Sequence, residues 1–527
     1  MEESKPTSSV IEENLRLSQS SIWQLQRKFF EQFGPNAWSK QIVPYQITNN
    51  AYIAQAYARV IFGWLRDIAA TIKPSQAVYI VELGAGSGRL AYHFLTAFFE
   101  FFDKSLFADI PISYVITDFT QATVDFWQNH PQLQSWIQSG RLDFALFDGE
   151  NDDSFVLLYS GKTLSQETVI NPMAVIANYF FDGLIQDMFS VENGQLKESL
   201  VTLKIAEANP DLNDMSQLEQ VEIKSEQYDI DPDYYEDPVF NQILEIYNQT
   251  IVQTHLLFPL GALVCLRNLL EISNGQLFLL SADKGYHREA DLLYRDKPAL
   301  ALHGSFSMMV NYHAIGQYTQ LRGGQFLSPP YQPGNLTICA AVFGEDSQDY
   351  VETEQAYDLE IVQRSPDDFF KLNKDIEAYY QNMSLESLLV QLRLNYWDSH
   401  IFILYCSTIL EKMENSPSKQ REEWYQAIQA IWSKYYFIGE DVDVPFALAR
   451  LLIELSYYTK ALEYLDYSLR LHGADVRTFY NIALCHYELR QFSEAFDYVN
   501  QALKVDSQFE LAQALAIQIQ SELRRNH

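Results

Sequence analysis

The sequence has few cysteines, few basic residues and no long hydrophobic run, and each shortage excludes a class of protein. Its four cysteines are far apart and form no C-x-x-C pair, so the sequence predicts neither a disulfide framework nor a zinc site. No apolar run reaches the roughly 18 residues of a membrane span, and the acidic start MEESKPTSSVIEENL lacks the basic residues and apolar run of a secretory signal. We therefore expect a cytoplasmic protein that binds no metal and no membrane.

Acidic residues outnumber basic ones by 69 to 37, which gives a formal net charge of -32. Such a charge repels nucleic acids and anionic membranes. Some of the acidic residues are clustered. Residues 207–237 hold eleven acidic side chains and one lysine, and a second cluster spans residues 345–368. These segments are either solvated loops or a surface that recruits a basic partner, such as a protein segment that carries arginine or lysine.

The most informative stretch, residues 78–90, reads VYIVELGAGSGRL. Its apolar, β-branched first half predicts a strand buried on both faces, and residues 90–102 after it have helical spacing. Gly84, Gly86 and Gly88 lie between the two elements. Glycine is needed in such a turn because the backbone adopts dihedral angles closed to other residues and lets a ligand approach its amide groups. The stretch predicts either a cofactor-binding turn or a glycine-rich turn without a ligand.

The spacing around this turn separates two kinds of cofactor. A dinucleotide site requires G-x-G-x-x-G and an acid about 20 residues later, but Arg89 stands at the third glycine position, and the first acid that closes a strand is Asp118. Glu82 and the three alternating glycines instead resemble motif I of class I S-adenosylmethionine-dependent methyltransferases. In that resemblance Glu82 lies near the methionine end of the cofactor, and Asp118 accepts hydrogen bonds from its two ribose hydroxyls.

Strands and helices alternate through much of the chain. The alternation predicts an α/β fold with a doubly wound, Rossmann-like parallel sheet, in which ligands bind at the carboxyl ends of the strands. Asp118, Asp148 and Asn178 fall at such ends. Asp148 either contacts the adenine amino group, as is common in this class of fold, or forms a plain Asp-Gly turn. We expect strands at residues 113–118, 142–148, 276–283 and 336–344 and from residue 174, and helices at residues 20–33, 51–72 and 123–128.

The alternation stops after residue 182. The segments MFSVE, Asn193-Gly194 and QLKESLVTL predict a β-hairpin, since an Asn-Gly pair tolerates the positive φ angles of a type I′ turn. An acidic loop and a helix over residues 238–258 are predicted to follow. We expect residues 188–274 to form a cap inserted into the sheet domain.

Four later segments, taken in order, resemble the MidA-type family of methyltransferases, which are related to a mitochondrial complex I assembly factor that methylates arginine. The resemblance spans residues 21–344 and implies a protein-arginine methyltransferase that uses S-adenosylmethionine. The segments are ANYFFDGL at 177–184, GQLKESLV at 194–201, ADKGY at 282–286 and SMMVNY at 307–312.

The resemblance also implies roles for residues of the substrate site. Asp182 and Asp283 would bind and polarise a guanidinium, Asn178 would accept a hydrogen bond, and Tyr179 or Phe180 would stack on the substrate. Two alternatives stay open, because Asp182 could instead cap a following helix and Asp283 could instead form a turn.

This sequence departs from the family at four positions of the catalytic half. Tyr179 replaces the acid of the family's Ala-Asn-Glu motif, and Ser305, Met309 and Asn311 replace two acids and a histidine. The sequence therefore matches the family more closely at the cofactor site than at the catalytic site.

The C-terminal third repeats itself at a period of 34 residues, which pairs Leu448 with Ile482 and Ala461 with Ala495. This is the period of a tetratricopeptide repeat, in which small residues let paired helices approach closely. We expect a capping helix at residues 511–523 and long helices at 385–413 and 422–436. The repeats would either bind a peptide partner on a concave face or serve as a structural or dimerising appendage.

The sequence as a whole predicts a methyltransferase that acts on a protein side chain, with arginine preferred, and whose repeats hold the substrate or an assembly partner. Two alternatives remain: a non-catalytic scaffold with a methyltransferase fold, and a methyltransferase of small molecules. The predicted parts are a helical segment at residues 1–75, the methyltransferase domain at 76–375, a helical connector at 376–440 and repeats at 441–527.

Overall fold

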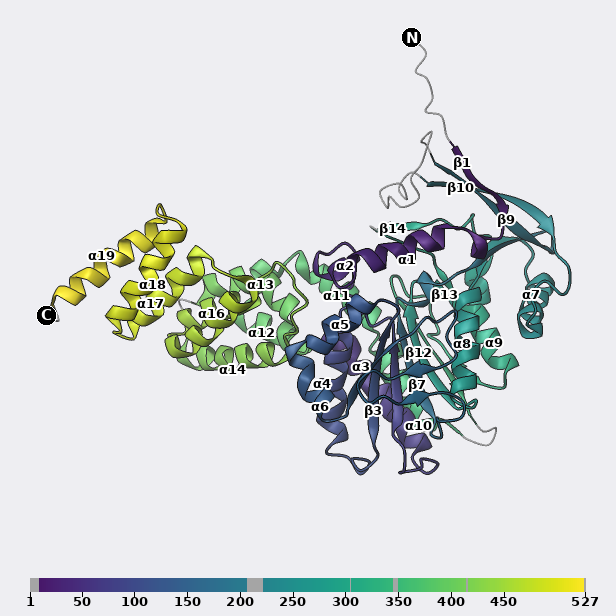
Figure 1. Ribbon diagram of the computed structural model, residues 1–527, viewed down its shortest axis with the longest axis horizontal. Helices are drawn as coiled ribbons and strands as arrows, with labels where there is room; N and C mark the ends of the chain where they lie inside the picture. Colours follow the sequence, from purple (N-terminus) through teal and green to yellow (C-terminus); the bar gives the residue numbers. More distant parts are fainter. Residues whose placement is uncertain (1–8, 206–220, 304, 345–348, 414–415, 526–527) are drawn as a thin grey trace, which may run out of the picture. The chain divides into compact units, whose positions relative to one another are not determined.

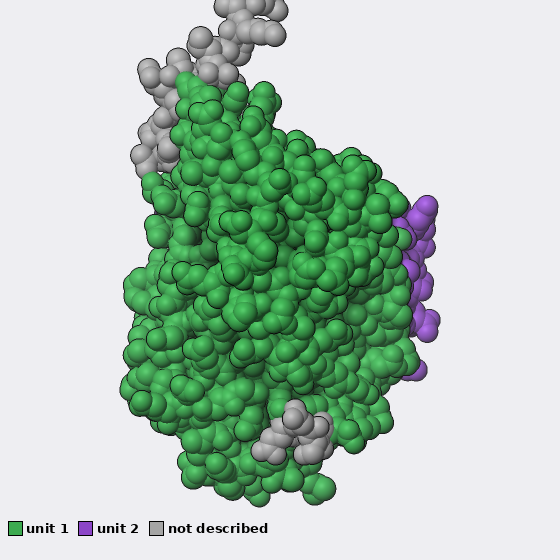
Figure 2. Space-filling view, turned by 90° about the vertical axis from the view of Figure 1, so that its right-hand side faces the viewer, with its two compact units in different colours: residues 1–371 green, residues 372–527 purple. Residues whose placement is uncertain are grey.

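The computed structural model describes residues 9–205, 221–303, 305–344, 349–413 and 416–525. The chain divides into two compact units, residues 1–371 and 372–527, which Figure 2 colours green and purple. Parts of both predicted acidic segments, residues 207–220 and 345–348, lie outside the described residues. Among the helices of the described ranges, none is long and apolar enough to cross a bilayer.

A seven-stranded sheet forms the centre of the first unit. Five parallel strands run in the order β12-β7-β2-β3-β4, and β18 and then β17 extend the sheet beyond β12, with β18 antiparallel to both neighbours. Both faces are buried: Leu279 of β12 lies in one core, while Phe278 stacks on Trp64 across the other face. The strands are β2 (Val78–Leu83), β3 (Ile112–Asp118), β4 (Leu142–Leu146), β7 (Met173–Asn178), β12 (Leu277–Asp283), β17 (Gln325–Leu327) and β18 (Thr337–Phe343).

Helices cover both faces of this sheet, so the predicted α/β architecture is confirmed. On one side α3 (Ala51–Ile68) packs against α4 (Arg89–Phe102) and α10 (Val351–Tyr357). On the other side α8 (Leu260–Ile272) and α9 (Tyr312–Leu321) share a core with the strands. Figure 1 shows the sheet between these two groups of helices.

The predicted hairpin after residue 182 belongs to a second, five-stranded sheet. Strands β8 and β9 pair antiparallel, and Asn193 and Gly194 between them have φ angles of 53° and 77°. The long β9 also pairs with β10 and with β1, while β8 pairs with β11. The strands are β1 (Ser9–Leu15), β8 (Asp187–Glu192), β9 (Gln195–Ile205), β10 (Val221–Asp229) and β11 (Thr254–Phe258).

Two predictions for these segments were wrong. The helix expected over residues 238–258 ends as α7 (Pro238–Thr250), and the chain then forms β11, because Thr254–Phe258 pairs with the free edge of β8 and buries Leu256 and Phe258. The N-terminal segment was predicted as helical only, but β1 joins β9. In both cases a partner strand distant in sequence decides the local structure.

Helix α1 (Ile22–Phe33) follows β1 and leads through Gly34, whose φ is 47°, to the short α2 (Asn36–Ser39). Glu12 of β1 holds the segment before α1, because it accepts hydrogen bonds from Ser20 Oγ at 2.8 Å and Ser21 N at 2.7 Å. Figure 1 shows α1 crossing over one end of the seven-stranded sheet.

The second unit is helical in its described part. The single helix predicted over residues 385–413 is two helices, α12 and α13, because Tyr396 and Trp397 between them adopt φ angles of 52° and 64°. Ala461 of α16 and Ala495 of α18 are both fully buried, and the tetratricopeptide assignment stays a prediction. The helices are α12 (Leu385–Leu394), α13 (Ser399–Met413), α14 (Ser418–Lys434), α15 (Val444–Glu454), α16 (Tyr458–His472), α17 (Val476–Glu488), α18 (Phe492–Val505) and α19 (Glu510–Arg525).

Candidate cofactor and substrate site

The predicted glycine turn joins β2 to α4. Gly84, Gly86 and Gly88 have φ angles of 59°, 53° and 73°, a region that side chains with a Cβ rarely adopt. Because α4 begins at Arg89, the amide groups of its first turn face the same end of the sheet. The turn therefore has the positive-φ backbone that its three glycines predicted.

Two predicted acids flank the turn in different surroundings. Asp118, the last residue of β3, accepts hydrogen bonds from Thr120 N and Oγ1 at 2.9 Å and lines a cavity with Gly84. Burial raises its pKa to about 6, so it is mostly ionised at pH 7 and can accept hydrogen bonds from hydroxyl groups. Glu82 is 3% exposed and accepts a 2.7 Å hydrogen bond from Tyr114 Oη. Burial raises the pKa of Glu82 to about 8.

The cavity at the carboxyl ends of β2 and β3 has a volume of about 110 Å³. Aromatic rings fill much of the space above the turn: a Cβ on Gly84 would meet the Phe180 ring at 2.8 Å, and one on Gly86 would meet the Trp38 ring at 2.7 Å. The lining residues are Gln26, Arg27, Phe30, Trp38, Gly84, Asp118, Phe119, Phe147, Asp148, Gly149, Tyr179, Phe180, Gly183 and Leu184.

The residues around this cavity fit S-adenosylmethionine in chemistry, since glycine amides can face its carboxylate and Asp118 its ribose. Ligand sites for molecules of this size usually measure about 300–1,000 Å³. The cavity is smaller than that, and the rings of Trp38 and Phe180 lie against the glycine turn. No sequence pattern marks Trp38, because it lies far from the motif along the chain and reaches the turn only through the fold.

Asp148 lies just after β4 and also lines the cavity, but its carboxylate is already bonded. Its Oδ2 accepts a 2.6 Å hydrogen bond from Arg27 Nη2 and a 2.9 Å bond from Asn151 Nδ2. Burial alone would raise the pKa of Asp148, but these hydrogen bonds and the Arg27 charge outweigh it and lower the pKa. The predicted adenine contact and the Arg27 pair therefore compete for one carboxylate.

The three predicted catalytic residues lie at the ends of β7 and β12 or just beyond them. Asn178 ends β7, where its Oδ1 accepts a 2.8 Å hydrogen bond from Tyr57 Oη and its Nδ2 donates to Thr48 O at 3.1 Å. Asp283 ends β12 and is fully buried, and its Oδ2 accepts a 3.2 Å hydrogen bond from Phe181 N. Both polar atoms of the Asn178 side chain are thus hydrogen-bonded to other residues of the protein.

Asp182 lies within the short 3-10 turn η3 (Phe181–Gly183), so there is no following helix for it to cap, and that alternative was wrong. Its carboxyl group bonds directly to that of Asp283 and accepts a hydrogen bond from Ser307. Burial raises the pKa of Asp182 to about 6, and burial together with the nearby Asp182 charge raises that of Asp283 well above its usual range. The two carboxyl groups therefore share one proton near neutral pH.

Tyr179, which replaces the family's acid, has a positive φ of 45° and donates its backbone N–H to Ala282 O at 2.9 Å. Positive φ is rare for an aromatic residue and often marks a functional site. The other residues that differ from the family's motif make contacts within the fold. Asn311 accepts a hydrogen bond from Ala314 N and caps α9, and Ser305 is buried. Met309 bonds Tyr286 Oη through its sulfur.

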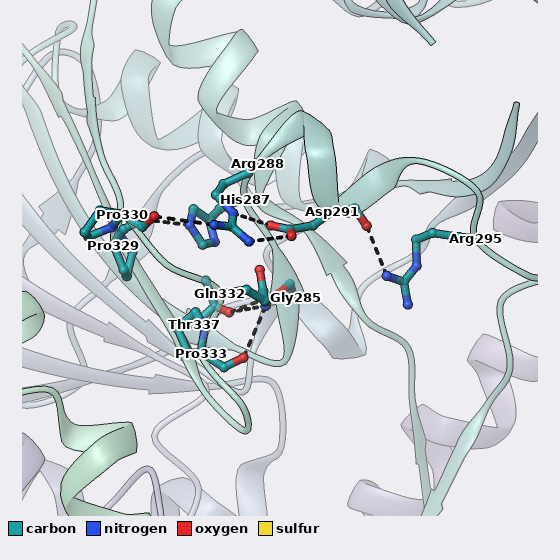
Figure 3. Close-up of polar contacts among 10 residues, drawn as sticks. All are labelled: Gly285, His287, Arg288, Asp291, Arg295, Pro329, Pro330, Gln332, Pro333 and Thr337. Atoms are coloured by element: carbon teal, nitrogen blue, oxygen red, sulfur yellow. Dashed lines mark hydrogen bonds and ion pairs between the residues drawn. The ribbon is translucent and has the colours of Figure 1, made fainter. Parts of the chain in front are cut away.

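Polar contacts fix the loop after Asp283, as Figure 3 shows. Gly285 O accepts hydrogen bonds from Gln332 Nε2 at 2.9 Å and Thr337 Oγ1 at 3.0 Å, and His287 Nε2 lies 2.8 Å from Pro329 O. The loop holds Asp283 at the end of β12, so both the turn role and a binding role are compatible with its position.

Residues 58–290, which contain the glycine turn and both carboxyl groups of the shared pair, match the model of a family described as "Putative S-adenosyl-L-methionine-dependent methyltransferase". The sheet domain is an S-adenosylmethionine-dependent methyltransferase. No curated protein matches the chain.

Among solved structures, the chain aligns with two proteins from Burkholderia thailandensis at 11% identity. The first is an uncharacterized superfamily protein, with 64% of this chain and 90% of that chain covered and a TM-score of 0.39. The second was solved with S-adenosyl-homocysteine, with 65% and 90% covered and a TM-score of 0.41. These scores are too low to transfer a ligand position or an activity to this chain.

Proposed function

We propose that the protein methylates an arginine side chain of a partner protein. The observation that carries the proposal is the buried carboxyl pair of Asp182 and Asp283 next to the glycine turn. Asp283 bonds the backbone of Phe181, and the neighbouring Phe180 ring lies against Gly84. These contacts link the pair to the glycine turn, which supports a substrate site beside the cofactor.

The chemistry of the pair suits a guanidinium. The cofactor supplies a methyl group on a sulfonium, and transfer requires an aligned nucleophile with a free lone pair. A free guanidinium has a pKa above about 12 and keeps its proton, so a carboxylate has to bind it and take a proton as the new bond forms. With one shared proton, the Asp182 and Asp283 pair provides one negative charge for this step.

The partner is proposed to be basic. Exposed acidic side chains of β10 and the loop after it form a negative surface on the inserted sheet, and they are Glu222, Glu226, Asp229, Asp231 and Asp233. The helical second unit, with its tetratricopeptide-like period, would hold the substrate protein or an assembly partner. Long-range attraction of this kind would speed association at low salt.

One observation favours a second candidate function, a scaffold that transfers no methyl group. The rings of Trp38 and Phe180 lie against the glycine turn, and the cavity is small. A protein that works only through its helical unit could keep such a closed site. Methylation of a small molecule is the third alternative.

Labelled methyl transfer separates these candidates. Purified protein is incubated with methyl-labelled S-adenosylmethionine and host-cell lysate, and labelled proteins are hydrolysed to amino acids. We expect labelled methylarginine, and we expect Asp182→Asn to lower its rate about 100-fold or more, as loss of a catalytic acid or base does. Label on another amino acid would refute arginine, label only on small molecules would favour the third alternative, and no label would favour the scaffold.

Asp291→Asn is the matched control. Asp291 also lies in a 3-10 turn, η5 (Glu289–Leu292), and its carboxylate bonds Arg288 instead of the shared carboxyl pair. We expect this variant to transfer label at the wild-type rate. Equal losses in both variants would mean that a general loss of folding explains the effect of Asp182→Asn.

A further inference from the structure

Arg27 of α1 lies in the part of the cavity that the resemblance assigns to the adenine ring. Its Nη2 donates to Asp148 Oδ2 at 2.6 Å, and its Cζ lies 4.8 Å from the centre of the Phe119 ring. The same cavity is lined by Gly84 and Asp118. Arg27 thus covers the aromatic ring that follows Asp118 and bonds the carboxylate predicted to contact adenine.

A second residue of the same N-terminal segment covers the glycine turn. The ring of Trp38 lies against Gly86, and it stacks on Phe30 of α1 with a centroid distance of 5.8 Å and an interplanar angle of 24°. Residues 26–38 therefore supply both a polar contact and an apolar contact to the cofactor cavity. The two contacts come from one continuous piece of chain.

Hydrogen bonds made by Glu12 and Gln26 anchor the N-terminal half of α1. Glu12 holds the start of α1, and Gln26 Nε2 donates to Phe306 O at 2.8 Å. The ion pair of Arg27 and Asp148 is screened by solvent, because the two side chains are 36% and 19% exposed. The Arg27 guanidinium can therefore leave Asp148 while the start of α1 stays in place.

We propose that Arg27, together with Trp38, forms an autoinhibitory latch that occupies the cofactor site until S-adenosylmethionine displaces it. The proposal rests on the proposed function in one respect, namely that the cavity binds this cofactor. Because only the open fraction of the protein binds, the latch raises the apparent dissociation constant by the reciprocal of that fraction. Loss of the latch therefore tightens binding without adding a contact to the ligand.

Isothermal titration with S-adenosyl-homocysteine tests the latch on the full-length protein. We expect Arg27→Ala to bind about two- to fivefold more tightly than the wild type, the range set by a partly exposed ion pair. Arg141→Ala is the matched control: Arg141 also pairs with an aspartate, Asp103, and lies 4.1 Å from the ring centre of Phe99, outside the cofactor cavity. We expect its affinity to equal that of the wild type.

Salt provides a second test, which starts from the wild-type protein. Raising sodium chloride from 0.05 to roughly 0.5 M screens the Arg27 pair, so the wild type should bind S-adenosyl-homocysteine a few-fold more tightly at high salt. The affinity of Arg27→Ala should not increase with salt in this way. Equal or weaker binding by Arg27→Ala, while the wild type binds, would overturn the latch and leave the proposed function standing. No binding by the wild type or by Arg27→Ala would overturn both.

Discussion

Asp118→Ala should weaken the binding of S-adenosyl-homocysteine by about 100-fold or more. Asp118 lines the cavity, and its carboxylate accepts hydrogen bonds from Thr120 and from the backbone N–H groups of Gly86 and Phe119. It is mostly ionised at pH 7, because its pKa is about 6. Two hydrogen bonds from ribose hydroxyls to a carboxylate contribute about 1.5–3 kcal/mol each, and their loss accounts for the expected factor. Isothermal titration at pH 7.5 measures it.

Asp143→Asn is the control for this prediction. Asp143 is a buried aspartate on the neighbouring strand β4, and it accepts backbone hydrogen bonds from Tyr159 and Ser160. It does not line the cofactor cavity, so its loss should change folding stability but not affinity. Wild-type affinity in Asp118→Ala would show that the ribose lies elsewhere.

Glu82 should make the sheet domain less stable as the pH rises. Burial raises its pKa to about 8, against a usual value of 4.5. Folded protein therefore binds more protons than unfolded protein between these pH values, and stability present below pH 4.5 is lost progressively up to about pH 8. The shift corresponds to about 4 kcal/mol between pH 5 and pH 9, at roughly 1.36 kcal/mol per pH unit.

Glu82→Gln should remove this dependence, because the amide oxygen can still accept the Tyr114 hydrogen bond and cannot ionise. For a unit of this size, about 4 kcal/mol corresponds to about 5 °C in melting temperature. Scanning calorimetry at pH 5 and pH 9 should therefore show a smaller fall in the first unit of Glu82→Gln than in the wild type. Glu245→Gln, at an exposed carboxylate on α7, should behave as the wild type. An equal fall in Glu82→Gln and the wild type would contradict the prediction.

Local patterns predicted the centre of the fold well. The apolar run of β2 and the alternating glycines fix a strand and a turn through residues close in sequence, and all three glycines adopt positive φ. The Asn193-Gly194 hairpin was predictable for the same reason. β1 and β11 were missed because they become strands only when they meet β9 and β8, which no local pattern records.

The candidate site was predictable in part for a related reason. Strand ends in a parallel sheet meet at one edge, so Asp118 and Asp148 could be placed at one cavity from their positions alone. The hydrogen-bond partners of a side chain cannot be read from its neighbours in sequence. Asp148 pairs with Arg27 and Asn178 with Tyr57, and each partner is 121 residues away. Arg27 and Trp38 belong to no sequence motif, and only the folded structure shows that they line the cofactor cavity.

Equilibrium dialysis of the wild-type protein against labelled S-adenosylmethionine tests the central claim most directly, because it asks whether the glycine turn and Asp118 hold this cofactor. The account predicts one bound molecule per chain, displaced by S-adenosyl-homocysteine and absent in Asp118→Ala. The absence of bound label, or label bound equally well by Asp118→Ala, would contradict it.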